Sequence, residues 1–195
     1  SSIEESEIDD KLINLLASND KLANHLHIPI QAGSDHVLKL MNRKYDLKSF
    51  IEKIKKIKSL LPEVAITTDV IVGFPQESEE DFISTMESCK EIGFAKMHVF
   101  PFSSRKGTVA SKMSNQIDGI TKKDRAKRLI ELSNSLNLKY NESFIDKNVD
   151  VLIEEEVDGF YIGHTSNYIK VKIKSFKNIE KWLKSIHNSN GKHRI

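Results

Sequence analysis

The chain has 195 residues, of which 38% are hydrophobic and 30% are charged, so it is long enough for one full-sized domain with a small appendage. Its single cysteine excludes a disulfide framework and a cysteine-based metal site. No apolar run approaches the roughly 18 residues that a membrane span needs, and the acidic N-terminal segment is unlike a secretory signal peptide. We therefore expect a cytoplasmic protein with no membrane partner.

The net charge of +2 conceals two strongly basic segments. Residues 105–128 hold eight Lys and Arg against Asp118 and Asp124, and residues 170–195 hold eight against Glu180. Segments of this kind either attract the phosphates of a nucleic acid or form a solvated face, and their composition favours neither reading.

Helical and strand patterns alternate through the first three quarters of the chain. Apolar residues at three- and four-residue spacing indicate the helices, and apolar runs bounded by Pro or Gly indicate the strands. The expected elements are a helix at 7–18, a strand at 25–30, a short helix capped by Ser34, a helix at 47–61, a strand at 64–72, a helix at 78–92, a strand at 95–100 and, after a loop at 101–120, a helix to about residue 146. This order predicts an α/β fold with a parallel sheet and right-handed crossovers.

The pattern changes near residue 147, where we place a boundary between a domain at 1–147 and a smaller one at 148–195. Short strands are expected at 149–154, 159–163 and 168–173, with Gly- and Asn-containing turns between them. The second part is therefore predicted to be a small all-β module.

Polar residues follow each predicted strand of the first part, where the carboxyl ends of parallel strands form ligand sites. Gly73 begins a turn into a helix whose free N–H groups suit an anion, although an ordinary turn has the same pattern. Ser34 can bind a ligand or simply cap a helix, and Arg43 can pair with a carboxylate or phosphate or simply lie on the surface. Phe100 and Phe102 either flank a nucleoside or belong to the core.

His25 and His27 point to one face of a predicted strand, an arrangement that also occurs in metal sites. No carboxylate or cysteine lies close to them in the sequence, so we predict no metal ligand. Cys89 lies on the apolar stripe of its helix and is expected to be a buried hydrophobe.

In order and spacing, these segments resemble the radical S-adenosylmethionine (SAM) methylthiotransferases, which add a methylthio group to tRNA adenosines or to a ribosomal protein aspartate. Residues 29–34 resemble the family's P-x-Q-S-G-S turn with Ala32 at the first Ser, and residues 73–77 resemble G-F-P-G-E with Gln76 at the second Gly. Residues 41–45 match M-x-R-x-Y, and residues 98–103 resemble H-V-F-P-Y-S. The residues that the resemblance places beside SAM are Gln31, Ser34, Arg43, Asp69, Gly73, Glu77 and His98.

The resemblance covers residues 1–173 and implies the C-terminal half of a radical SAM partial (β/α) barrel, followed by a TRAM-like module, a small β-barrel that binds RNA. The match fades after about Ile173, and the sequence beyond it does not show the closing strands expected of a complete barrel. The residues that it places against tRNA are Tyr161, His164, Tyr168, Lys170 and Lys172. Half a barrel leaves a sheet edge open, and self-association through that edge is expected.

The family's chemistry requires SAM and [4Fe–4S] clusters held by a C-x-x-x-C-x-x-C motif. That motif is absent from this chain, so we assign no catalytic residue and expect the chain alone to be inactive. The sequence most resembles the branch that modifies N6-threonylcarbamoyladenosine at tRNA position 37. The isopentenyladenosine branch, the ribosomal-protein branch and a stand-alone RNA-binding remnant are the alternatives.

Overall fold

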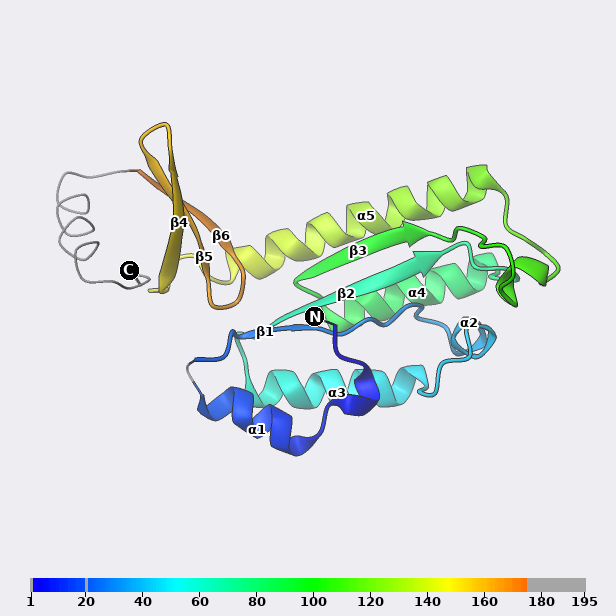
Figure 1. Ribbon diagram of the computed structural model, residues 1–195, viewed down its shortest axis with the longest axis horizontal. Helices are drawn as coiled ribbons and strands as arrows, with labels where there is room; N and C mark the ends of the chain where they lie inside the picture. Colours follow the sequence, from blue (N-terminus) through cyan, green and yellow to red (C-terminus); the bar gives the residue numbers. More distant parts are fainter. Residues whose placement is uncertain (1, 20, 175–195) are drawn as a thin grey trace.

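The computed structural model describes residues 2–19 and 21–174 (Figure 1). The elements in chain order are η1 (Glu5–Glu7), α1 (Asp10–Ser18), β1 (His25–His27), α2 (Asp35–Leu40), α3 (Leu47–Leu60), β2 (Ala65–Val72), α4 (Glu79–Ile92), β3 (Lys96–Pro101), η2 (Ala110–Lys112), α5 (Gly119–Glu142), β4 (Val151–Val157), β5 (Phe160–Thr165) and β6 (Lys170–Lys174).

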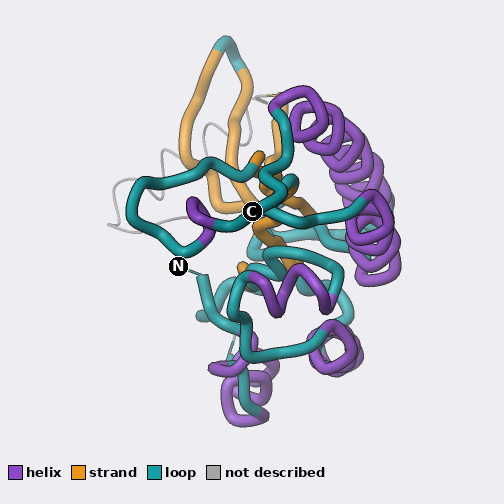
Figure 2. The backbone as a smooth tube through the Cα atoms, turned by 90° about the vertical axis from the view of Figure 1, so that its right-hand side faces the viewer, coloured by secondary structure: helices purple, strands orange, loops and turns teal. Residues whose placement is uncertain are grey.

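The first three strands form a parallel sheet in the order β1-β2-β3, which confirms the predicted α/β architecture. The register aligns His27 with Thr67 and Asp69 with His98. The apolar core combines one face of this sheet with α3, α4 and α5, so these helices lie on one side of it (Figure 2). A set of βα units with all its helices on one side is consistent with part of a barrel.

Local sequence signals fix the ends of these elements. Ser78 and Asp81 form a reciprocal capping box at the start of α4, and Gly93 ends that helix in the left-handed conformation at φ 64°. The long helix begins two residues earlier than expected, because the Asp118 side chain accepts hydrogen bonds from the backbone N–H groups of Ile120 and Thr121. β1 is shorter than the predicted strand, although a single bridge between Gln31 and Val70 extends its pairing.

β4, β5 and β6 form a separate antiparallel sheet at the C-terminal end of α5 (Figure 1). The turn between β5 and β6 packs against the first part of the chain: the buried Asn167 donates from Nδ2 to the Tyr140 hydroxyl at 2.8 Å. The small all-β module is thus confirmed through Lys174, while its predicted remainder to residue 195 lies outside the described residues. The domain boundary near residue 147 remains a prediction.

Gly33 is required by close packing of the loop after β1 against α4. A Cβ atom there would lie 2.7 Å from the Thr85 Cα. We expect Gly33→Ala to lower the free energy of unfolding by about 1–3 kcal/mol, as for other overpacked sites. Urea unfolding measures this, with Gly119→Ala as the matched control.

Gly119 has open space at its Cβ position and lies in the first turn of α5. Its replacement by alanine is expected to leave stability unchanged or to raise it by up to about 1 kcal/mol. Equal effects of the two substitutions would contradict the packing role of Gly33.

Over the described part of the chain, no helix combines the length and the apolar character needed to cross a membrane.

Candidate functional site

The face of the parallel sheet opposite the core, here called the inner face, carries polar side chains from three adjacent strands. His25 and His27 lie on β1, Thr67 and Asp69 on β2, and His98 on β3. Alternation along each strand directs these side chains to one side and the apolar core residues to the other. No α-helix from the described residues packs into the core from this face.

The polar residues of the inner face touch one another. His27 Nε2 lies 3.3 Å from Asp69 Oδ1, and the rings of His27 and His98 are 5.8 Å apart. The Thr67 hydroxyl lies 2.9 Å from His27 Nδ1 and 3.0 Å from His25 Nε2. No carboxylate lies near His25 and His27 in the sequence. In the folded chain, Asp69 of the neighbouring strand β2 supplies one. Burial, followed by the nearby His27 ring, lowers the pKa of His25 and favours its neutral form.

Gln31 lies at the carboxyl edge of the sheet, directly beyond the inner face. Its φ of 63° is left-handed, yet its backbone still pairs with β2, donating to the Asp69 carbonyl at 3.0 Å and accepting from the Ile71 N–H at 2.8 Å. Its half-buried side chain makes no hydrogen bond within residues 2–19 and 21–174. Gln31 thus retains its amide for a ligand.

Ser34 has its hydrogen bonds satisfied inside the protein. Its hydroxyl caps α2 and donates to Asp81 Oδ1 at 2.5 Å, while His36 Nδ1 lies 2.9 Å from Asp81 Oδ2. Burial raises the pKa of Asp81, but the hydrogen bonds from Ser34, Ser78 and His36 outweigh it and lower that pKa to about 2. Of the two readings of Ser34, the structure therefore displays the helix cap.

Glu77 is buried beneath the turn that follows β2. Its Oε2 accepts hydrogen bonds from the Gly73 N–H and, at 3.1 Å, from Arg125 Nη1. Its Oε1 is buried and has no partner among the described residues. Burial raises the pKa of Glu77, and the Gly73 N–H and Arg125 only partly oppose that rise. The sequence placed Arg125 in a basic block and gave no sign of this contact.

Two other predicted cofactor residues lie in surroundings that differ from the expectation. At Gly73, a Cβ atom would lie 2.1 Å from the Lys122 Cγ, so the glycine accommodates a side chain of α5. Arg43 pairs with Glu4 at 3.2 Å in the N-terminal segment. The predicted set therefore separates into inner-face residues (Asp69, His98), edge residues (Gln31, Ser34, Gly73, Glu77) and the outlying Arg43.

Phe100 and Phe102 have different surroundings. Phe100 is 51% exposed, whereas Phe102 packs against Phe74 with ring centroids 5.0 Å apart. Phe102 therefore belongs to a small second core beneath the carboxyl edge, and Phe100 remains available to a ligand.

The β4–β6 sheet presents a basic face. Lys170, Lys172 and Lys174 are exposed at alternate positions of β6. Tyr161 is only 6% exposed, and strand alternation places it on the opposite face from its neighbour Ile162, which pairs with Lys172. Its ring is therefore not an open stacking surface beside the lysines, contrary to the expectation from sequence.

Tyr168 joins the basic face to the inner face. It is 62% exposed, and its ring lies 4.6 Å from that of His25 and 6.2 Å from that of His164. His164 Nδ1 also lies 2.8 Å from Glu154 Oε2. A row of rings thus runs from the parallel sheet to the small module: His98 contacts His27, the Thr67 hydroxyl joins His27 to His25, and His25 is followed by Tyr168 and His164.

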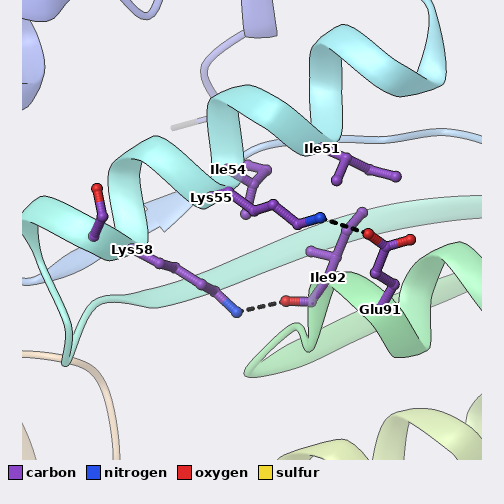
Figure 3. Close-up of a pocket in the computed structure, with 7 residues that line it drawn as sticks. Ile51, Ile54, Lys55, Lys58, Glu91 and Ile92 are labelled. Atoms are coloured by element: carbon purple, nitrogen blue, oxygen red, sulfur yellow. Dashed lines mark hydrogen bonds and ion pairs between the residues drawn. The ribbon is translucent and has the colours of Figure 1, made fainter.

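A pocket of about 450 Å³ lies between α3 and α4, on the helical side of the molecule (Figure 3). Across it, Lys55 Nζ pairs with Glu91 at 2.7 Å and Lys58 Nζ donates to the Ile92 carbonyl at 2.6 Å. These contacts tie the two helices together. The pocket contains none of the residues predicted to bind SAM or tRNA.

The only cysteine of the chain does not fit an iron–sulfur cluster. Cys89 is fully buried in the core, and burial raises the pKa of its thiol to about 12. A cluster requires several exposed thiolates that converge. The polar groups at the carboxyl edge, in contrast, suit a ligand with hydrogen-bonding groups such as SAM, because neither the Gln31 amide nor Glu77 Oε1 has a hydrogen-bond partner among the described residues.

Comparison with known proteins also points to the radical SAM superfamily. Residues 2–89 match the family model of the radical SAM superfamily. The chain is 45% identical over 179 residues to the threonylcarbamoyladenosine tRNA methylthiotransferase MtaB of Bacillus subtilis, covering 89% of this chain and 40% of that protein. It is 46% identical over 148 residues to a tRNA-2-methylthio-N(6)-dimethylallyladenosine synthase of a Thermoanaerobacter species, covering 76% of this chain and 31% of that protein.

Among solved structures, Escherichia coli coproporphyrinogen III oxidase, a radical SAM enzyme, superimposes with a TM-score of 0.58 at 13% identity, covering 99% of this chain and 50% of that one. That likeness concerns the fold alone. This chain spans 40% of the Bacillus subtilis relative and 31% of the Thermoanaerobacter relative. The chain belongs to the radical SAM methylthiotransferase family.

Proposed function

We propose that this chain is the C-terminal part of a tRNA methylthiotransferase that adds a methylthio group to N6-threonylcarbamoyladenosine at tRNA position 37, using SAM and iron–sulfur clusters. The 45% identity to the Bacillus subtilis relative supports this nucleoside. The 46% identity to the Thermoanaerobacter relative supports dimethylallyladenosine as the second candidate. The observation that carries the proposal is the row of rings that leads from the inner face to the basic face of β6.

In this proposal, the carboxyl edge of the sheet binds SAM. The amide of Gln31 hydrogen-bonds to SAM, and the buried Glu77–Arg125 pair holds the turn after β2 in place. Bound SAM supplies the radical chemistry of the family. The cluster ligands are not part of this chain, so we expect the chain alone to bind without turnover.

The basic face is proposed to bind tRNA. Lys170, Lys172 and Lys174 contact phosphates. The exposed ring of Tyr168 and the half-buried ring of His164 stack on unpaired bases of the anticodon loop. A base that follows the row of rings arrives at the inner face. Self-association is proposed to occur through β3, whose outer side pairs with no strand of the described chain.

A salt titration of binding to an unmodified tRNA anticodon stem-loop, with and without SAM, tests the proposal. Replacing Lys170, Lys172 and Lys174 together by Gln is expected to reduce the slope of log K against log salt by about 2, because each lost phosphate contact contributes about 0.7 for single strands. Substitution of Lys11, Lys48 and Lys90, which are exposed elsewhere, is the matched control and should leave the slope unchanged.

The two branches are separated by comparing stem-loops that carry each modified adenosine. Tighter binding of the threonylcarbamoyl form supports the first nucleoside, and tighter binding of the dimethylallyl form supports the second. Absence of salt-sensitive binding at low salt would contradict the role of this chain in tRNA recognition.

A further inference from the structure

We propose that His27, Asp69 and His98 on the inner face form a binding site for a divalent transition-metal ion such as Zn²⁺. One ligand atom from each residue lies within 4.8 Å of the others. Ligands of a tetrahedral Zn²⁺ at about 2.1 Å lie about 3.4 Å apart. His27 Nε2 and Asp69 Oδ1 already have this separation, at 3.3 Å.

The third ligand, His98, can rotate its side chain to complete the site. His98 is exposed, and its position opposite Asp69 in the register brings its ring to the same patch. A rotation of this side chain moves its nitrogen closer without disturbing the core. Three protein ligands leave at least one coordination position open to a water or to a substrate group, as in catalytic rather than structural zinc sites.

Thr67 orients His27, one of the ligands of the proposed site. Its hydroxyl, on a residue only 9% exposed, lies 2.9 Å from His27 Nδ1 and can accept a hydrogen bond from the Nδ1–H. It then donates its own proton to His25 Nε2 at 3.0 Å. This arrangement directs the lone pair of His27 Nε2 toward Asp69, the orientation that ligating histidines receive from their hydrogen-bond partners.

Charge and chemistry define the ligand class. Two imidazoles with one carboxylate suit Zn²⁺, Co²⁺ or Fe²⁺, whereas Mg²⁺ and Ca²⁺ prefer oxygen ligands. Asp69 and His98 thus bind a metal ion in place of SAM, independently of tRNA binding. The ion would lie at the end of the row of rings, facing any base that enters along it.

Titration of the metal-free 195-residue chain with Co²⁺ tests the site, because Co²⁺ bound to nitrogen and oxygen gives a visible absorption band. We expect one Co²⁺ per chain, displaced by Zn²⁺. His27→Gln, Asp69→Asn and His98→Gln should each weaken binding at least tenfold. Thr67→Val should weaken it about 10- to 100-fold, the usual effect of losing a supporting hydrogen bond.

Two controls locate the ion. His36→Gln removes a similar histidine beside a carboxylate, 2.9 Å from Asp81, and should leave binding unchanged. The double variant of His187 and His193, which lie outside the described residues, should also bind normally. Circular dichroism verifies that each variant is folded, and Asp69→Asn, which preserves side-chain size, decides the result if a histidine variant unfolds. No band, or a band lost only in a control variant, would overturn the proposal, and neither outcome affects the RNA titration.

Discussion

Replacing Arg125 by methionine is expected to lower the free energy of unfolding by about 3–5 kcal/mol, because it leaves the Glu77 carboxylate buried without its counter-ion. Both side chains are almost fully inaccessible, with exposures of 5% for Arg125 and 1% for Glu77. Arg125 also donates to the Glu77 carbonyl at 3.2 Å and lies over the Phe82 ring, so its loss frees both the turn after β2 and the start of α4. Urea unfolding at neutral pH measures the loss.

The pH dependence of this loss follows from the raised pKa of Glu77. In the folded state this pKa lies above its ordinary value of 4.5, so ionised Glu77 costs stability at neutral pH. The cost disappears as the pH falls through the folded pKa toward the unfolded one. Without Arg125 the folded pKa rises further, so the destabilisation by Arg125→Met should be largest at neutral pH and smaller at about pH 5.

Two variants test the cause of this effect. Arg128→Met breaks a more exposed pair with Glu79, 2.7 Å away, and should cost no more than about 1 kcal/mol. Adding Glu77→Gln to Arg125→Met removes the buried charge and should restore most of the stability. A loss from Arg125→Met that is independent of pH, or equal to that from Arg128→Met, would show that the buried charge is not its source.

The elements that the sequence predicts well are those with short-range signals. The capping box of Ser78 and Asp81 begins α4 at Glu79, one residue after the predicted start, and Gly93 ends the helix as predicted after residue 92. The apolar run before Gly73 forms the central strand β2, and most of its residues are buried. Helix capping and apolar periodicity depend on residues three or four positions apart, so a single sequence contains the information that predicts these elements.

The features of the candidate site that the sequence misses depend on contacts between distant segments. Arg125 and Glu77 are 48 residues apart, and His27 and Thr67 are 40 apart. Only the register of the sheet shows that Asp69 lies beside His27, because the two residues are far apart in the sequence. Tyr161 illustrates a different cause: the family resemblance groups it with Tyr168 and His164, whereas alternation along β5 separates it from the basic face.

Replacing Asp81 by alanine is expected to be the second large effect, lowering the free energy of unfolding by about 2–4 kcal/mol at neutral pH. The 12% exposed carboxylate accepts hydrogen bonds from the Ser34 hydroxyl and the Ser78 N–H and contacts His36. Hydrogen bonds to a charged group are worth about 1.5–3 kcal/mol, and loss of a helix cap adds to this. The variant also removes one of the hydrogen bonds that join the loop of Gln31 to α4, so the proposed SAM binding should weaken together with stability.

The pH dependence of the Asp81 effect has the opposite sign to that of Glu77. The folded pKa of Asp81, about 2, lies below its ordinary value of 3.8, so its contribution is present above the ordinary pKa and is lost as the pH falls through about 2. The difference in unfolding free energy between the native chain and Asp81→Ala should therefore be constant above about pH 5 and shrink toward pH 2. Asp118→Ala is the matched control, since within the described part of the chain that carboxylate bonds only to its own helix. A smaller loss for Asp118→Ala identifies the tie between α4 and the Ser34 loop as the origin of the excess, whereas equal losses would reduce Asp81 to an ordinary helix cap.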